Sequence, residues 1–149
     1  MAKVGKPSAK LQALTVFVGK WITHGTIHAA GGKSSSEIRA VDEYKWLPGQ
    51  FFMLHQADAR MDGKPAQSIE VLGYDAKRGC YLTRSYDDQG VSVEFTARLD
   101  GHRWEIDGET MRFRGAFSDD VATLSGTWEQ LGDGDKWSPW MDIKLRKVT

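Results

Sequence analysis

Residues 44–58 read Tyr-Lys-Trp-Leu-Pro-Gly-Gln-Phe-Phe-Met-Leu-His-Gln-Ala-Asp, and this stretch decides the fold. Pro48-Gly49 is typical of the centre of a type II turn, because proline fixes φ at the second position and glycine accepts a positive φ at the third. Strand-like runs flank the dipeptide on both sides. If these two residues are the whole turn, Leu47 faces Gln50 and every other pair follows by counting outward. The stretch therefore predicts a β-hairpin with a defined register.

The counted register divides the hairpin into two faces. One face sets opposite charges across from each other, as expected where a sheet is solvated: Glu37 with Arg60 and Arg39 with Asp58. The other face is apolar except for two directly opposed residues, Asp42 and His55. Its remaining members are Ile38, Ala40, Tyr44 and Trp46 on one strand, and Ala59, Ala57, Met53 and Phe51 on the other. We expect this second face to point inward and to carry a carboxylate–imidazole pair within hydrogen-bonding reach.

Beyond the hairpin, short alternating runs and turn signals continue to the C-terminus. The turn signals recur every ~8–12 residues, a spacing typical of sandwiches and barrels. One short helix is expected near the N-terminus. Ser8 can cap it, and Leu11 and Leu14 lie within it at helical spacing. We therefore predict an all-β fold, an antiparallel up-and-down barrel of about ten strands that closes and so removes its edges. Residues 1–7 are expected to be a disordered tail, and residues 8–149 a single domain.

Composition excludes several classes of partner. The 149-residue chain has 20 basic and 20 acidic residues and a formal net charge of zero, whereas a nucleic-acid-binding protein normally shows a basic face. The N-terminus lacks the apolar core of a signal peptide, and no apolar run approaches membrane-spanning length. Cys80 is the only cysteine, which excludes an intrachain disulfide and suits a reducing compartment. We expect a cytoplasmic protein without nucleic-acid or membrane partners, either a monomer or a homodimer.

Short motifs give a second line of inference. Gly19-Lys20-Trp21 follows the expected helix and opens the meander, which resembles the Gly-x-Trp opening of the calycin superfamily of lipocalins, fatty-acid-binding proteins and nitrobindin. More specifically, residues 10–148 resemble an uncharacterised bacterial family of lipocalin-like domains of unknown function. The matching segments are Tyr44–Phe52, Gly73–Asp75, Leu124–Glu129 and Trp137–Asp142. The resemblance implies a lipocalin-like barrel with an internal cavity, distantly similar to nitrobindin and fatty-acid-binding proteins, and implies no particular activity.

Two turn lengths decide whether three further polar side chains lie inside. A two-residue turn at residues 62–63 places Glu70 inward near the carboxylate–imidazole pair, whereas a bulged three-residue turn places it outward. A two-residue loop at residues 88–89 likewise places Arg84 and Tyr86 inward, where a guanidinium would suit a ligand carboxylate. Both counts stay open from the sequence. The candidate ligand-binding residues are Tyr44, Trp46, Met53, His55, Glu70, Arg84, Tyr86 and Trp128.

Three functions are open at this point. The one we favour is the binding of a small hydrophobic or amphipathic molecule in an aromatic-rich cavity with a few convergent polar groups. The second is a cofactor-independent isomerase or cyclase in which Asp42 orients His55 as a general base. The third is a haem protein similar to nitrobindin. Because no histidine follows His102, the iron would have to be bound by His55 or His24.

The Asp42–His55 pair also has a purely structural interpretation, in which it fixes the strand register and faces trapped water. His24 and His28 share one strand face, but no cysteine or acidic residue at close spacing completes a metal site. The better inward set of that strand is Trp21, Thr23, Gly25 and Ile27. We therefore predict no metal ion and no cofactor.

Overall fold

In the computed structural model, the described residues, 5–28 and 35–149, form ten strands and short helical segments. Of the tail expected at residues 1–7, residues 1–4 lie outside the described part of the chain. The helical segments are α1 (Ala9–Ala13), η1 (Leu14–Phe17) and η2 (Asp133–Asp135), and none of the described helices could cross a membrane. The strands are β1 (Gly19–His28), β2 (Ser35–Trp46), β3 (Met53–Met61), β4 (Lys64–Asp75), β5 (Cys80–Asp87), β6 (Ser92–Asp100), β7 (Arg103–Asp107), β8 (Met111–Phe117), β9 (Thr123–Leu131) and β10 (Trp137–Lys147).

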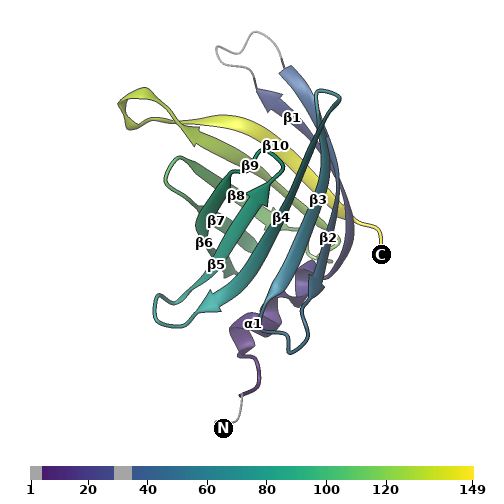
Figure 1. Ribbon diagram of the computed structural model, residues 1–149, viewed down its shortest axis with the longest axis vertical. Helices are drawn as coiled ribbons and strands as arrows, with labels where there is room; N and C mark the ends of the chain where they lie inside the picture. The colour runs from purple at the N-terminus through teal and green to yellow at the C-terminus, as the bar shows by residue number, and fades with distance from the viewer. Residues whose placement is uncertain (1–4, 29–34) are drawn as a thin grey trace.

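All ten strands belong to one closed antiparallel barrel (Figure 1). Strands that follow one another in sequence are hydrogen-bonded neighbours, and β1 closes the barrel on β10, where Trp21 pairs with Lys147 and Ile27 with Met141. Closure gives every strand two partners, so the sheet has no free edge. The predicted fold class, an all-β up-and-down barrel with one short N-terminal α-helix, is confirmed.

The N-terminal helical segment covers one end of the barrel, which we call the helix end (Figure 1). Ser8 caps α1 by accepting a hydrogen bond from the Leu11 amide (3.3 Å). Leu14 and Phe17 are almost completely buried, since they point from η1 into the barrel. Phe17 packs on three rings at centroid distances of 5.0–5.1 Å, those of Tyr44, Trp104 and Phe117. The turns between β3 and β4 and between β9 and β10 lie at the opposite end, which we call the far end.

The central hairpin turns at Pro48-Gly49, as predicted. The Gln50 amide donates to the Leu47 carbonyl (2.9 Å), and Gly49 has a φ of +95°, as a type II turn requires. Gln50 also has a positive φ, and the Leu47 amide donates to the Phe52 carbonyl (2.9 Å). Leu47 therefore faces Phe52 and not Gln50. The predicted register of this hairpin is wrong by two residues, because the dipeptide is only part of the turn.

A register shift of two residues keeps every side chain on its predicted face, because strand side chains alternate with period two. Tyr44 pairs with His55, and Asp42 pairs with Ala57. Asp42 and His55 both remain inward, as diagonal neighbours and not as the directly opposed pair that the sequence predicts. On the outer face, the predicted charge pairs are replaced by Arg39 opposite Arg60 and Val41 opposite Asp58.

Candidate functional site

The two halves of the barrel interior differ in the size of their side chains. Near the helix end the interior is packed with large residues, and the most deeply buried of them are Trp21, Phe17, Leu14, Met53 and Leu72. Toward the far end, the inner wall of β2–β4 carries a group of short side chains between the interior residues Met53 and Leu72 and the pair of Ile38 and Met61. Their register pairs are Ala40 with Ala59, Ala59 with Ala66, and Ala57 with Ser68. These short side chains fill less of the interior than the aromatic residues of the helix end.

Polar side chains from β1–β4 form one hydrogen-bonded chain on this inner wall. The Thr23 hydroxyl donates to Asp42 Oδ2. The two ring nitrogens of His55 contact two carboxylates, Nε2 with Asp42 Oδ1 (2.6 Å) and Nδ1 with Glu70 Oε1 (3.1 Å). Tyr44 lies opposite His55 and stacks on its ring, with centroids 4.0 Å apart and an interplanar angle of 10°. We call Thr23, Asp42, Tyr44, His55 and Glu70 the interior polar cluster.

His55 is a cation in this arrangement. Ionised carboxylates only accept hydrogen bonds, so His55 needs an N–H on both ring nitrogens, which only the imidazolium has. Burial by itself lowers the pKa of His55, but the hydrogen bonds to Asp42 and Glu70 outweigh it and raise the pKa from 6.5 to about 9. Burial and the two carboxylates raise the pKa of the Tyr44 phenol well above its usual value, so this hydroxyl stays protonated.

Two polar groups of the inner wall are left without a partner. His55 binds Oε1 of Glu70, and among the described residues no donor bonds to Oε2. The side chains of His55 and Glu70 keep 16% and 18% of their surface accessible, against 8% for Asp42. Thr83 on β5 is fully buried, and within the described part of the chain its hydroxyl has no partner. It lies two residues along β5 from Ser85, which pairs with Glu70.

Strand alternation explains which cluster members the sequence finds. The two-residue turn between β3 and β4 is confirmed, because Met61 pairs with Lys64 and His55 with Glu70. Glu70 therefore points inward beside His55. Thr23 is inward as predicted, but its hydrogen bond to Asp42 was missed, since nothing in the sequence fixes the register of β1 against β2. Its place in the inward set of β1 was the only available signal.

Arg84 and Tyr86 lie on the outer face, so the inward placement that a two-residue loop would give is wrong. Tyr86 pairs with Ser92 and not with Val91, which makes the loop one residue longer in register. A shift of one residue reverses the face of every side chain on the strand. The Arg84 side chain is 60% exposed and forms an ion pair with Glu94 (3.0 Å). The predicted internal guanidinium is therefore absent from β5.

The other predicted ligand-binding residues are not members of the interior polar cluster. Met53 is fully buried and pairs with Trp46, and both pack in the core at the helix end. Trp128 lies on β9, which is five steps from β4 in either direction around the barrel. It therefore belongs to the wall opposite Glu70. Trp128 packs there against two rings at centroid distances of 5.4 and 5.8 Å, those of Phe113 and Phe95.

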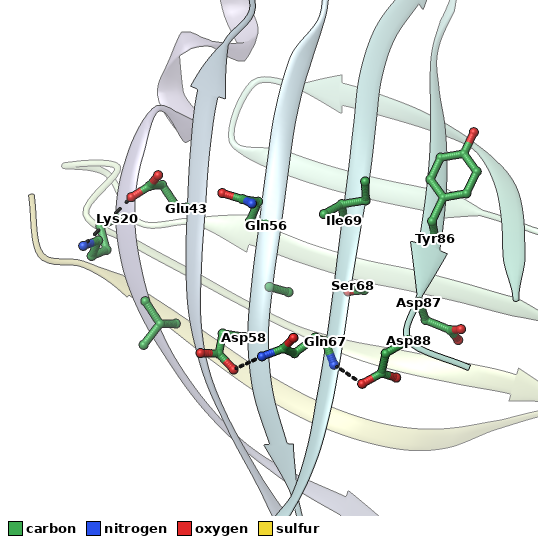
Figure 2. Close-up of a pocket in the computed structure, with 12 residues that line it drawn as sticks. Lys20, Glu43, Gln56, Asp58, Gln67, Ser68, Ile69, Tyr86, Asp87 and Asp88 are labelled. Carbon is green, nitrogen blue, oxygen red and sulfur yellow. Dashed lines mark hydrogen bonds and ion pairs between the residues drawn. The ribbon is translucent and has the colours of Figure 1, made fainter. Parts of the chain in front are cut away.

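The outer surface of β1–β5 carries an open groove of about 590 Å³ (Figure 2). Its polar side chains bond to one another. Lys20 forms an ion pair with Glu43 (3.9 Å), and the Gln67 side chain donates to Asp58 (3.3 Å). The backbone N–H of Gln67 donates to the Asp88 carboxylate (3.0 Å). Figure 2 shows these contacts along the groove. Such solvent-exposed pairs are weak and mutually satisfied, so we place the candidate site inside the barrel.

The donor atoms do not fit a haem or a metal ion. Both ring nitrogens of His55 are held by carboxylates, so iron could bind only by displacing one of them. His24 and His102 are exposed, the first on the outer face of β1 and the second in the turn after β6. Among residues 5–28 and 35–149, no three side chains of His, Cys, Asp or Glu are arranged to hold a metal ion.

Comparisons with known proteins support the barrel fold. A family model described as "Protein of unknown function (DUF1579)" matches residues 6–147. The crystal structure of Rv2717c from M. tuberculosis has a TM-score of 0.69 and 16% sequence identity, over 97% of this chain and 100% of that chain. A de novo designed fluorescence-activating β-barrel has a TM-score of 0.50 and 13% identity, over 91% of this chain and 97% of that chain. No curated protein matches the sequence.

Proposed function

The chain belongs to the family described as protein of unknown function (DUF1579), and from the geometry of its barrel we propose that it binds a small, partly apolar molecule against the interior polar cluster. The family description names no activity, so the proposal rests on the site itself. The apolar body of the ligand lies along the short side chains of β2–β4, and its polar group bonds to Glu70. The designed barrel that resembles this chain is described as fluorescence-activating, which supports the capacity of the fold to hold a small molecule.

One observation carries the proposal: the interior polar cluster is incompletely satisfied on its accessible side. Charged groups in an apolar interior are costly unless partners surround them. Asp42 has such partners in Thr23 and His55 and is buried. Glu70 has one free oxygen and an accessible side chain. A pair that only fixed the strand register would not need Glu70 at all. Titratable groups of shifted pKa in an interior site are typical of ligand or substrate binding.

The acid–base enzyme receives less support from this geometry. A general base at neutral pH needs a free lone pair. His55 has none, because both ring nitrogens donate to carboxylates and the pKa is about 9. We infer that Asp42 and His55 together hold Glu70 in position, with its second oxygen turned to the ligand.

Filling the interior tests the proposal. Ala57 lies between Asp42 and Ser68 in the register, on the inner wall next to the cluster. We expect Ala57→Leu to weaken binding of the neutral fluorescent probe 1-aminoanthracene by about tenfold or more, because the added side chain occupies the ligand volume. Fluorescence titration measures the dissociation constant.

Ala116→Leu is the matched control, because Ala116 is exposed on the outer face of β8. It should leave binding unchanged, and the melting temperatures of both variants should be measured alongside. Equal binding by wild type and the Ala57→Leu variant would show that the probe lies elsewhere and would remove the proposal. The same follows if wild-type protein does not bind the probe.

Two finer assignments belong to the proposal as well. Membership of the calycin superfamily is supported by Gly19-Lys20-Trp21, which stands where the helical segment meets β1. There the Trp21 indole is buried and donates to the Phe17 carbonyl (2.8 Å). A location in the bacterial cytoplasm is supported by Cys80, which is free and buried and suits a reducing compartment.

A further inference from the structure

The interior polar cluster carries a negative charge that it does not neutralise itself. Two carboxylates, those of Asp42 and Glu70, flank a single imidazolium on His55. Both hydrogen bonds need the doubly protonated ring, so His55 contributes one positive charge and no more. One negative charge is left over, and it belongs to the side of the cluster that is accessible. Asp42 is buried, so this side is the free Oε2 of Glu70.

Among the described residues of β2–β6, the one basic residue on the inner face is Lys64, which lies six residues from Glu70 along β4. The other basic side chains within these strands are exposed on the outer face: Arg39, Lys45, Arg60, Arg84 and Arg98. Lys64 is exposed at the far end, where β4 begins. The next residues around Glu70 on the inner wall are Ser68 and Ser85, which are neutral. Within the described part of the chain, His55 is thus the one cationic partner of the Glu70 carboxylate.

Lys147 is inward but serves the helix end. Its ammonium group donates to the Val16 carbonyl (2.8 Å) and lies 4.8 Å from the centroid of the Trp21 ring. Trp21 pairs with Lys147 on one side and with Asp42 on the other, so a whole strand separates Lys147 from Asp42. Glu70 lies two strands further away, on β4. Lys147 therefore leaves the accessible charge uncompensated.

Two groups on the inner face of the barrel suit a cation with an apolar body. The Thr83 hydroxyl, fully buried without a partner among the described residues, lies on the adjacent strand. Trp128, which packs against Phe95 and Phe113 on the opposite wall, offers an aromatic surface to the apolar body of the ligand. We propose that the interior site takes an organic cation, a protonated amine on an apolar body, and rejects carboxylates. This rests on the interior binding site proposed above and adds the charge of its ligand.

Three probes with the same chain and different head groups test the inference on unmodified protein. These are octylammonium, octanol and octanoate, each titrated near neutral pH as a competitor of 1-aminoanthracene. We expect octylammonium to bind about tenfold more tightly than octanol, through one charge-assisted hydrogen bond, and octanoate to bind most weakly. Octanoate binding as tightly as octylammonium would overturn the inference.

Glu70→Gln identifies the oxygen responsible, because it removes the charge and keeps the shape. In this variant octylammonium should lose about tenfold in affinity, and its advantage over octanol should disappear. Glu43→Gln makes the same chemical change on the outer groove and should alter neither (Figure 2). A loss of octylammonium binding in the Glu43→Gln variant, with none in the Glu70→Gln variant, would place the cation outside the barrel and overturn the inference.

The outcomes separate this inference from the function on which it rests. If octanol binds, Ala57→Leu abolishes that binding, and octylammonium gains nothing over octanol, then interior binding stands and the preference for a cation fails. If none of the three probes displaces 1-aminoanthracene, the preference for a cation fails, whereas interior binding is decided by 1-aminoanthracene and the Ala57→Leu variant alone. The order octylammonium, octanol, octanoate in wild type, lost in the Glu70→Gln variant, supports both.

Discussion

Replacing Asp42 with alanine is expected to lower the free energy of unfolding by about 3–5 kcal/mol, the range for breaking a buried ion pair. The substitution removes the acceptor of both Thr23 and His55, and each then has a buried donor without a partner. Urea unfolding followed by tryptophan fluorescence measures the change. Asp58→Ala is the control, because Asp58 is exposed on the outer face of the neighbouring strand. That variant should lose less than about 1 kcal/mol. Equal losses in the two variants would contradict the interior ion pair.

The same ion pair predicts how stability depends on pH. Folding raises the pKa of His55 from 6.5 to about 9, so the folded protein holds this proton more tightly than the unfolded chain. The resulting stabilisation is complete below about pH 6.5 and is lost as the pH rises through about 9. The difference in unfolding free energy between wild type and the Asp42→Ala variant should therefore shrink across this window. A difference that stays constant from neutral pH to above 9 would mean that His55 is not charged in the folded state.

Phe17→Ala is expected to cost about 3–5 kcal/mol, the range for truncating a fully buried phenylalanine. Phe17 is 1% exposed and joins the helical segment to the rings of Tyr44, Trp104 and Phe117. Without it the helix end loses the contact that joins these three rings, and the substitution leaves a cavity among them. Chemical denaturation should show a lower midpoint with an unchanged slope.

Phe52→Ala provides the matched control. Phe52 is 53% exposed at the end of the central turn, so its removal should cost less than about 1 kcal/mol. Equal effects of the two substitutions would show that the N-terminal helical segment does not form part of the core.

The sequence predicts correctly which face a side chain occupies if the register is correct, or if it is wrong by an even number of residues. Asp42 and His55 came inward although the central hairpin is shifted by two residues, because alternation survives an even shift. Glu70 came inward because the turn at residues 62–63 has two residues. Arg84 and Tyr86 lie outside because the loop after β5 shifts the register by one residue. The sequence thus predicts the face of the sheet on which a side chain lies better than it predicts the cross-strand partner.

Turn chemistry explains why the loop lengths themselves were not predictable. Pro48-Gly49 marks the centre of its turn correctly, but nothing in the dipeptide shows that Gln50 will also take a positive φ. Between β5 and β6, the Asp87 carboxylate accepts hydrogen bonds from the Gln89 and Val91 amides and stabilises a longer loop. These are contacts of the folded loop, and several loop lengths are compatible with the same residues.

The charge of the interior polar cluster could not be predicted from the sequence for a related reason. Alternation placed Asp42 and His55 together, but two effects on the pKa of His55 oppose each other, burial and the carboxylates. Their balance depends on whether Glu70 reaches the second ring nitrogen, as it does here (3.1 Å). With one carboxylate the imidazole could serve as a base. With two carboxylates the ring is held as an imidazolium, and the accessible charged group of the cluster is the carboxylate of Glu70.

Nitrogen-15 NMR of histidine side chains tests the central claim most directly, because it reads the protonation of each ring and the site of binding in one titration. The chain has four histidines, and only His55 lies inside the barrel among carboxylates. At about pH 7.5 we expect both ring nitrogens of His55 to be protonated, while an unperturbed histidine is mostly neutral. Adding octylammonium should shift the His55 signals and leave those of His24 and His102 unchanged. A neutral His55, or ligand-induced shifts at the exposed histidines alone, would contradict an interior site built on this cluster.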